Sequence, residues 1–192
     1  MKTITRHTEA TLEVKRSKFI AHLFPCGMFD AVMAELRAAH PKGRHFVTAY
    51  RRINAFDQVV EGCGDDGEPK GTSGKPTLAV LQGHDLVNVG IITVRYFGGI
   101  KLGTGGLVRA YGDAANLVIS EAELVEYRKE FTRVFACDYS AMGVVEYEME
   151  QCGVRSAEKN FEAAGVVIVA VGTEEDLALF FTKVERLVRV AE

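Results

Sequence analysis

The chain has 192 residues, of which 47% are hydrophobic and 26% are charged, and its net charge at pH 7 is −3. This composition is ordinary for a globular protein and allows one or two small domains with real cores. No run of about 18 apolar residues occurs, which argues against a membrane-spanning helix. The polar N-terminus is unlike a secretory signal, so we expect a cytoplasmic protein.

The first third of the chain predicts strands and one helix. Apolar and polar side chains alternate in four short segments, as they do in half-buried strands. One further segment repeats apolar side chains at helical spacing and is ended by Pro41. We expect strands at residues 11–14, 18–24, 44–53 and 58–61, the last two as a hairpin, and a helix at residues 30–40.

Eleven of the 19 glycines lie in one stretch, residues 67–112, where two glycine loops bracket an apolar run. The loops are residues 67–76 and residues 98–106. The run between them, residues 87–97, is rich in Val and Ile and predicts a buried central strand. We expect Phe97, at the end of this strand, to lie in the core.

A helix is expected after each loop. Pro76 suits the first position of a short helix at residues 77–82. Thr104 is the predicted N-cap of a long helix that runs to about residue 121. A strand, a glycine loop and a helix start in this order direct backbone N–H groups at an anion.

The last third predicts a second domain. Residues 125–137 look extended and contain the expected domain crossing near residues 128–131, although no Pro, Gly or Ser linker marks it. Beyond it, Ser140 and Thr173 are predicted N-caps of two helices. The expected order of elements is strand, helix, strand, strand, helix, strand, which is typical of a ferredoxin-like fold. Residues 131–192 carry 6 Lys or Arg and 11 Asp or Glu, so this domain is acidic and suits a different partner from the first.

The four cysteines are too far apart for a Cys-x-x-Cys motif. Their spacing favours free thiols in a reducing compartment over a disulfide framework or a zinc site. We expect all four to be buried, namely Cys26, Cys63, Cys137 and Cys152.

The glycine-rich stretch is cationic. From Pro69 to Gly112 five Lys or Arg stand against Asp85 alone, a balance that suits phosphate or the RNA backbone. The Walker A loop, the dinucleotide fingerprint and the nucleophile elbow each lack a required residue here. Because both loops flank one strand, we expect the five cations to share a face, with a solvated surface as the alternative. The predicted phosphate- or nucleic-acid-binding residues are Lys70, Lys75, Arg95, Tyr96, Lys101, Thr104, Gly105 and Arg109.

A few residues are weaker candidates for catalysis. Asp65, Asp66 and Glu68 can hold Mg²⁺ with a phosphate ligand, or they can be a solvated turn whose carboxylates accept local N–H groups. The turn is the favoured interpretation. His45 can act as a general base or as a surface hydrogen-bonding group near this acidic loop. The spacing of the other histidines predicts no metal site, and no cofactor is expected.

The glycine-rich stretch resembles the signature of the IMPACT/YigZ family. The resemblance also extends to the length and layout of the whole chain, as in a bacterial two-domain member. One departure is Val47, where family members often carry a Cys two residues after His45, and this argues against a Cys–His nucleophile. The matching segments are residues 16–20 (RSKFI), 65–69 (DDGEP), 71–76 (GTSGKP) and 95–111 (RYFGGIKLGTGGLVRAY).

The resemblance implies an α+β protein of two domains. Residues 1–130 would be similar to the fourth domain of elongation factor G, which has a ribosomal-protein-like βαβ fold. Residues 131–192 would be ferredoxin-like and similar to the fifth domain of that factor. The family is associated with translation control, and its eukaryotic members bind a ribosome-associated activator of a stress kinase. No reaction is established for the family.

The sequence therefore predicts a regulatory binding protein linked to translation rather than an enzyme. Its basic glycine-rich stretch would contact RNA or a ribosomal component, and its acidic C-terminal domain would contact a protein partner or tune access to the RNA. The alternative is a hydrolase or another enzyme for a phosphorylated small molecule, acting near His45 and residues 65–68. A well-formed pocket at those residues would favour the enzyme, whereas an open basic face would favour the binding protein.

Overall fold

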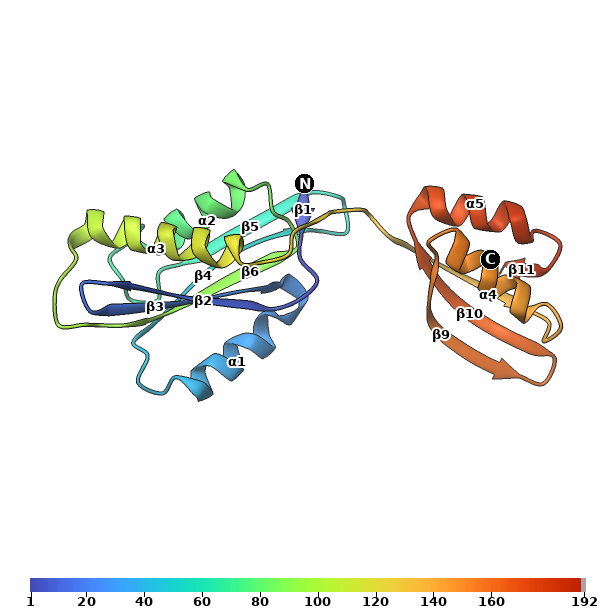
Figure 1. The fold of residues 1–192 in the computed structure, drawn as a ribbon, viewed down its shortest axis with the longest axis horizontal. Helices are drawn as coiled ribbons and strands as arrows, with labels where there is room; N and C mark the ends of the chain where they lie inside the picture. The colour runs from blue at the N-terminus through green and yellow to red at the C-terminus, as the bar shows by residue number, and fades with distance from the viewer. Residues whose placement is uncertain (191–192) are drawn as a thin grey trace. The chain divides into compact units, whose positions relative to one another are not determined.

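A computed structural model describes residues 1–190. The chain folds as two compact units, Met1–Tyr127 and Arg128–Glu192. Each unit combines helices with an antiparallel sheet (Figure 1). This is the two-domain α+β class that the sequence predicts.

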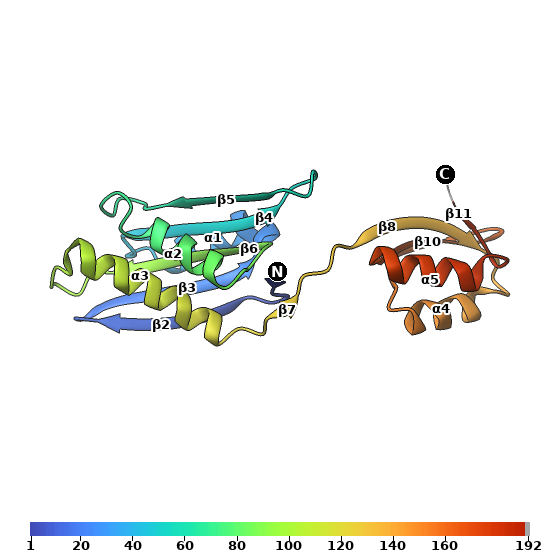
Figure 2. The same ribbon diagram turned by 90° about the horizontal axis from the view of Figure 1, so that it is seen from above.

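Five antiparallel strands in the spatial order β2-β3-β6-β4-β5 form the main sheet of the first unit (Figure 2). The central strand β6 is buried along its whole length except at Tyr96. Val and Ile fill it because helices cover both faces of the sheet, so no position is left for alternating polar residues. The strands are β2 (Thr8–Val14), β3 (Ser17–Pro25), β4 (His45–Ile53), β5 (Val59–Gly64) and β6 (Val89–Tyr96).

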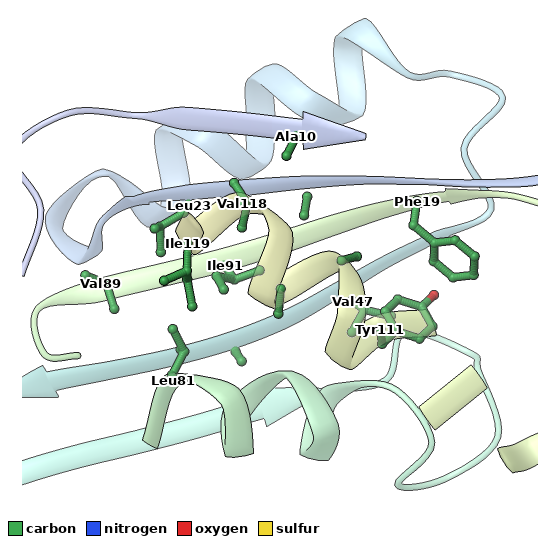
Figure 3. Packing of buried hydrophobic residues seen from close by; sticks show 14 of the residues in the cluster. Ala10, Phe19, Leu23, Val47, Leu81, Val89, Ile91, Tyr111, Val118 and Ile119 are labelled. Atoms are coloured by element: carbon green, nitrogen blue, oxygen red, sulfur yellow. The ribbon is translucent and has the colours of Figure 1, made fainter. Parts of the chain in front are cut away.

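Three helices cover this sheet, with α2 and α3 on one face and α1 on the other (Figure 1). Side chains of α2 and α3, such as Leu81 and Tyr111, meet Phe19 and Ile91 of the sheet in one buried cluster (Figure 3). α2 begins before the predicted start at residue 77. The helices are α1 (Phe29–Ala39), preceded by the 3-10 turn η1 (Cys26–Met28), α2 (Gly74–Gly83) and α3 (Gly103–Ser120).

A short ladder at one end of the first unit was not predicted. β1 (Lys2–Thr3) pairs antiparallel with β7 (Val125–Glu126). Two-residue strands contain no periodic pattern, so the sequence gives no local signal for them. The ladder joins the two ends of the first unit.

The second unit is a four-stranded sheet in the order β11-β8-β10-β9, with α4 and α5 packed in the same buried cluster. With the chain order β8-α4-β9-β10-α5-β11 this is the predicted ferredoxin-like arrangement. Within residues 1–190, no helix has the length and apolar character that crossing a membrane demands. The elements are β8 (Phe131–Cys137), α4 (Met142–Gln151), β9 (Arg155–Glu162), β10 (Gly165–Gly172), α5 (Glu174–Val184) and β11 (Val188–Val190).

Of the two N-cap residues predicted in this unit, one is confirmed and the other is not. Thr173 is the N-cap of α5, and its side chain accepts a hydrogen bond from the Asp176 N–H at 3.1 Å, as predicted. The prediction for Ser140 was wrong, because Ala141 is the N-cap residue of α4 and makes no side-chain cap. The chain enters α4 through a turn in which the Ala141 N–H donates to the Asp138 carbonyl at 3.0 Å.

Two of the four cysteines are not buried. Cys137 and Cys152 lie in the core of the second unit as predicted, but Cys26 is half-buried and Cys63 is exposed. Cys63 lies on the edge strand β5, where alternate side chains point to solvent. All four cysteines are free.

Candidate functional site

Two glycines with different structural demands fix the loop between β6 and α3. A Cβ atom on Gly98 would clash with the backbone of Arg16, and the Gly98 N–H donates to Ser17 Oγ at 3.1 Å. Gly103 has a φ of +72°, a left-handed conformation that favours glycine. The loop is therefore packed against the β2–β3 turn and gives α3 a fixed starting point.

A cavity of about 460 Å³ lies where this loop, the first glycine loop, β4, β6 and α3 meet. Its volume is in the range of small-molecule sites. Apolar and cationic side chains share its wall. The lining residues are Arg44, His45, Glu68, Pro69, Arg95, Phe97, Lys101, Leu102, Gly103, Thr104 and Leu107.

Three buried polar groups are tied together at the wall of this cavity. Glu68 Oε1 accepts hydrogen bonds from Arg95 Nη1 at 2.6 Å and from the Tyr111 hydroxyl at 2.8 Å. The Arg95 and Glu68 side chains are only 7% and 4% exposed. Burial and the neighbouring Glu68 carboxylate raise the pKa of Tyr111. The Tyr111 hydroxyl therefore stays protonated and donates a hydrogen bond to Glu68.

The sequence grouped Arg95 with the other cations of a shared binding face, but in the structure Arg95 is buried and paired with Glu68. Its guanidinium lies 5.4 Å from the centroid of the Phe19 ring and 5.7 Å from that of Phe97. Glu68 neutralises its charge at close range, so the exposed basic surface is smaller than the sequence suggested. Within residues 1–190, Arg95 Nε has no hydrogen-bond partner.

His45 on β4 is the direct cross-strand neighbour of Arg95 on β6, and it lines the same cavity. Its Nδ1 is 2.8 Å from the backbone carbonyl of Asp66. A carbonyl only accepts, so Nδ1 carries the proton, and in the neutral ring Nε2 is the acceptor. His45 thus occupies the position near the acidic loop that the sequence analysis considered for it.

The carboxylates of the acidic loop are engaged in local structure. Asp65 accepts from the Gly71 N–H at 2.7 Å, from the Ser73 hydroxyl and N–H at 2.7 and 3.2 Å, and from the Gly74 N–H at 2.8 Å. Burial acts against its charge, but these four hydrogen bonds outweigh that effect and lower the pKa of Asp65. Asp66 Oδ2 accepts from a backbone N–H at 2.7 Å. Within residues 1–190 no group of three or more His, Cys, Asp or Glu is arranged to hold a metal.

Four cations of the glycine-rich stretch are exposed: Lys70, Lys75, Lys101 and Arg109. None of them forms an ion pair with another described residue. Lys75 is in the first turn of α2 and Arg109 is in α3, so both lie on the side of the sheet that these helices cover. Lys101 lines the cavity itself.

Tyr96 does not join these cations. Successive side chains of a strand point to opposite faces, and Tyr96 packs in the cluster that contains Val32 and Leu36 of α1. Its hydroxyl is 2.9 Å from His40 Nδ1. Tyr96 therefore lies on the face of the sheet that α1 covers, whereas Arg95 contacts Glu68 beside Tyr111 of α3 on the other face.

The start of α3 is open. The predicted cap Thr104 is already helical, because Gly103 turns the chain into the helix one residue earlier, and the N-cap residue Leu102 makes no side-chain hydrogen bond. Thr104, Gly105 and Gly103 are exposed. The first N–H groups of a helix have no intrahelical acceptor, so this end of α3 presents donors beside the cavity.

Several residues that line the cavity were not predicted as site residues, among them Phe97 and Arg44. Phe97 is 47% exposed, so its predicted place in the core was wrong. It follows Tyr96, the last residue of β6, and so lies just beyond the end of this strand. Arg44, just before β4, was not predicted either. The spacing of Arg95 and Phe97 on one face of an extended chain is the signal that could have found Phe97.

Known proteins are similar to this chain in sequence and in fold. Residues 15–119 match the sequence family described as the Impact N-terminal domain. An IMPACT family member of Haemophilus influenzae is 40% identical over 156 residues, which are 79% of this chain and 75% of that protein. The Escherichia coli IMPACT family member YigZ is 37% identical over 166 residues, 83% and 79% of the two chains. A crystal structure of a hypothetical protein is 29% identical with a TM-score of 0.70, covering 98% of this chain and 95% of the other.

Proposed function

The chain belongs to the IMPACT family, and on that premise we propose that it is a regulatory binding protein linked to translation in the cytoplasm. It would contact RNA or a ribosomal component through its basic glycine-rich face. This face consists of residues 67–76 and 98–106 with the exposed side chains of Lys70, Lys75, Lys101 and Arg109.

The exposed cations beside the open end of α3 carry this proposal. Positive side chains and uncapped helical N–H groups are both suited to phosphate oxygens. A free ammonium or guanidinium group can neutralise a phosphate, whereas a cation already paired with a carboxylate cannot do so without breaking that pair. The four exposed cations are therefore the side chains that we expect to contact phosphates.

The link to translation rests on the resemblance to two adjacent domains of a ribosome-binding elongation factor. The second unit has the ferredoxin-like element order that this resemblance implies for it. Its acidic composition is unsuited to RNA, so we propose that it contacts a protein partner. A shared fold alone would not justify a shared function, and the exposed basic residues supply the independent support.

An enzyme acting near His45 and residues 65–68 is less well supported. A metal ion, or an acid–base pair built from this loop, needs carboxylate oxygens that are available to it. Asp65 accepts four hydrogen bonds, and Glu68 is held by Arg95 and Tyr111. Local structure thus uses the oxygens that this chemistry would require.

The salt dependence of RNA binding tests the proposal. Three or four phosphate contacts predict that log Kd against log salt changes with a slope of magnitude roughly 2 to 3, at about 0.7 per phosphate of a single strand. The double variant Lys101→Glu plus Arg109→Glu should abolish binding, because two attractive contacts become repulsive. The measurement is fluorescence anisotropy of labelled single-stranded RNA with the full chain.

Two results would count against the proposal. Affinity that is indifferent to salt between low and physiological ionic strength would remove the RNA contact and leave a protein partner. Phosphatase or nuclease turnover that disappears in His45→Ala would favour the enzyme instead.

A further inference from the structure

We propose that the cavity beside α3 holds one nucleotide of a single-stranded RNA, with the phosphate at the start of α3 and the base against Phe97. This inference rests on the proposed function and assigns a specific site within it. A nucleotide combines an anion with a flat apolar group, and the cavity offers a partner for each.

The phosphate end is defined by α3 and Lys101. α3 has 18 residues and no side-chain cap, so its first N–H groups and the positive end of its dipole are directed at an anion. Lys101 lines the cavity and is exposed. Arg44 adds a second exposed cation to the lining, and neither of the two pairs with a described carboxylate.

Arg95 supplies an independent sign of a missing ligand. The residue is only 6% exposed and lines the cavity. Its Nη1 binds Glu68, but Nε has no hydrogen-bond partner among residues 1–190. Buried donors are almost always satisfied in native structures. Nε itself is closed to solvent, so an acceptor atom of a bound nucleotide would reach it only after a shift of the Arg95 side chain.

The base end is defined by Phe97. An aromatic ring that is 47% exposed, in a lining that also includes Leu102 and Leu107, leaves apolar surface open to solvent. One side of the ring is near the Arg95 guanidinium. Aromatic rings stack on bases regardless of sequence. A bare phosphate would leave this apolar wall uncovered, which is why we infer a nucleotide.

The size of the cavity suits one nucleotide. A volume of about 460 Å³ suits a single small-molecule-sized group. The same chemistry is offered by a nucleotide within an RNA chain and by a free nucleotide. Further nucleotides of a chain would lie outside the cavity, where Lys70, Lys75 and Arg109 are exposed.

Two pairs of variants test the site in the full chain. Thr104→Glu places a carboxylate where the phosphate would lie, yet an acidic residue in the first turn favours the helix, so the variant should fold at least as well as the parent. Thr104→Gln is its uncharged control. Phe97→Ala removes the stacking ring, and Phe56→Ala is the matched control because Phe56 is 81% exposed and lies outside the cavity lining.

The probes are hexaadenylate RNA, adenosine 5′-monophosphate and adenosine, titrated at low salt by calorimetry, with thermal melting as the folding check. Thr104→Glu should weaken binding of the RNA at least about tenfold without lowering the melting temperature, since like charges then face each other. Phe97→Ala should weaken it roughly 5- to 150-fold, the range for loss of one stacked base. The salt slope should stay unchanged in Phe97→Ala. Phe56→Ala should bind like the parent, and Thr104→Gln should bind more tightly than Thr104→Glu because it adds no negative charge.

The probes also separate this inference from the proposed function. RNA binding that is equally strong in Thr104→Glu and Phe97→Ala would overturn the cavity site and leave the basic face intact. Binding of adenosine 5′-monophosphate, but not of RNA, with the same variant effects would support the cavity with a free nucleotide and overturn the RNA function. Adenosine binding as strongly as its phosphate would overturn the phosphate site. No binding of any probe would overturn both proposals.

Discussion

His22 is a buried histidine that the folded protein keeps uncharged. It is 2% exposed, and its Nδ1 lies 3.2 Å from His7 Nε2 and 3.6 Å from Glu9 Oε2. Burial, followed by the positive charges of His7 and His40, lowers the pKa of His22 from 6.5 to about 4. Within residues 1–190, Glu9 is the only carboxylate that contacts the His22 ring, and Glu9 is exposed.

We predict that acid destabilises the first unit through His22. Between pH 6.5 and about 4 the unfolded chain binds a proton that the folded chain does not bind. The free energy of unfolding therefore falls as the pH falls, by up to about 1.4 kcal/mol per pH unit. In His22→Gln this slope should flatten, whereas in His84→Gln, at an exposed histidine, it should persist. Urea unfolding at a series of pH values measures it, and an unchanged slope in His22→Gln would contradict the prediction.

Residues of the candidate site differ in how far the sequence could place them. Glycine loops and lysines near them are visible as a pattern, and Lys101 does line the cavity. The pairing of Arg95 with Glu68 is not visible, because the two are 27 positions apart and meet only when the first glycine loop folds against β6. Long-range partners change an apparent surface cation into a buried one, and local sequence carries no information about them.

Elements of the fold were easier to predict than their ends. β6 and the helices appear where the apolar pattern changes period. The start of α3 was misplaced because Thr104 has the chemistry of a cap, but Gly103, with its positive φ, sets where the chain turns. A residue type can favour a cap only if the backbone before it allows one, and the backbone here depends on packing against the β2–β3 turn.

We predict opposite effects for two alanine substitutions in the β6–α3 connection. Gly98→Ala should destabilise the first unit by about 1–3 kcal/mol or more, because its Cβ would overlap the Arg16 backbone. Gly105→Ala should stabilise it by roughly 0.5–1 kcal/mol, since Gly105 is within α3 and its Cβ would meet nothing within 4 Å. Thermal unfolding of both variants measures the difference. Equal stability would show that the loop is not packed as described.

At the scale of the whole molecule, the two units have separate cores and different charge. The core of the first unit and that of the second share no residue. No Pro-, Gly- or Ser-rich linker marks the crossing in the sequence. We propose that the first unit binds RNA and the second binds a protein. These separate roles require that each unit keep its fold independently.

Limited proteolysis tests whether residues 1–130 and 131–192 are independent domains. Residues 127–130 have no regular secondary structure, and Arg128 and Lys129 are exposed. Proteases cut first where a backbone is exposed and few contacts oppose local opening. Trypsin should therefore cut first after Arg128 or Lys129 and leave two resistant fragments, which mass spectrometry identifies. In Arg128→Gln plus Lys129→Gln this first cut should disappear, because trypsin needs a basic residue. First cuts inside the β4–β5 hairpin, or a single core that resists division, would contradict the two-domain assignment.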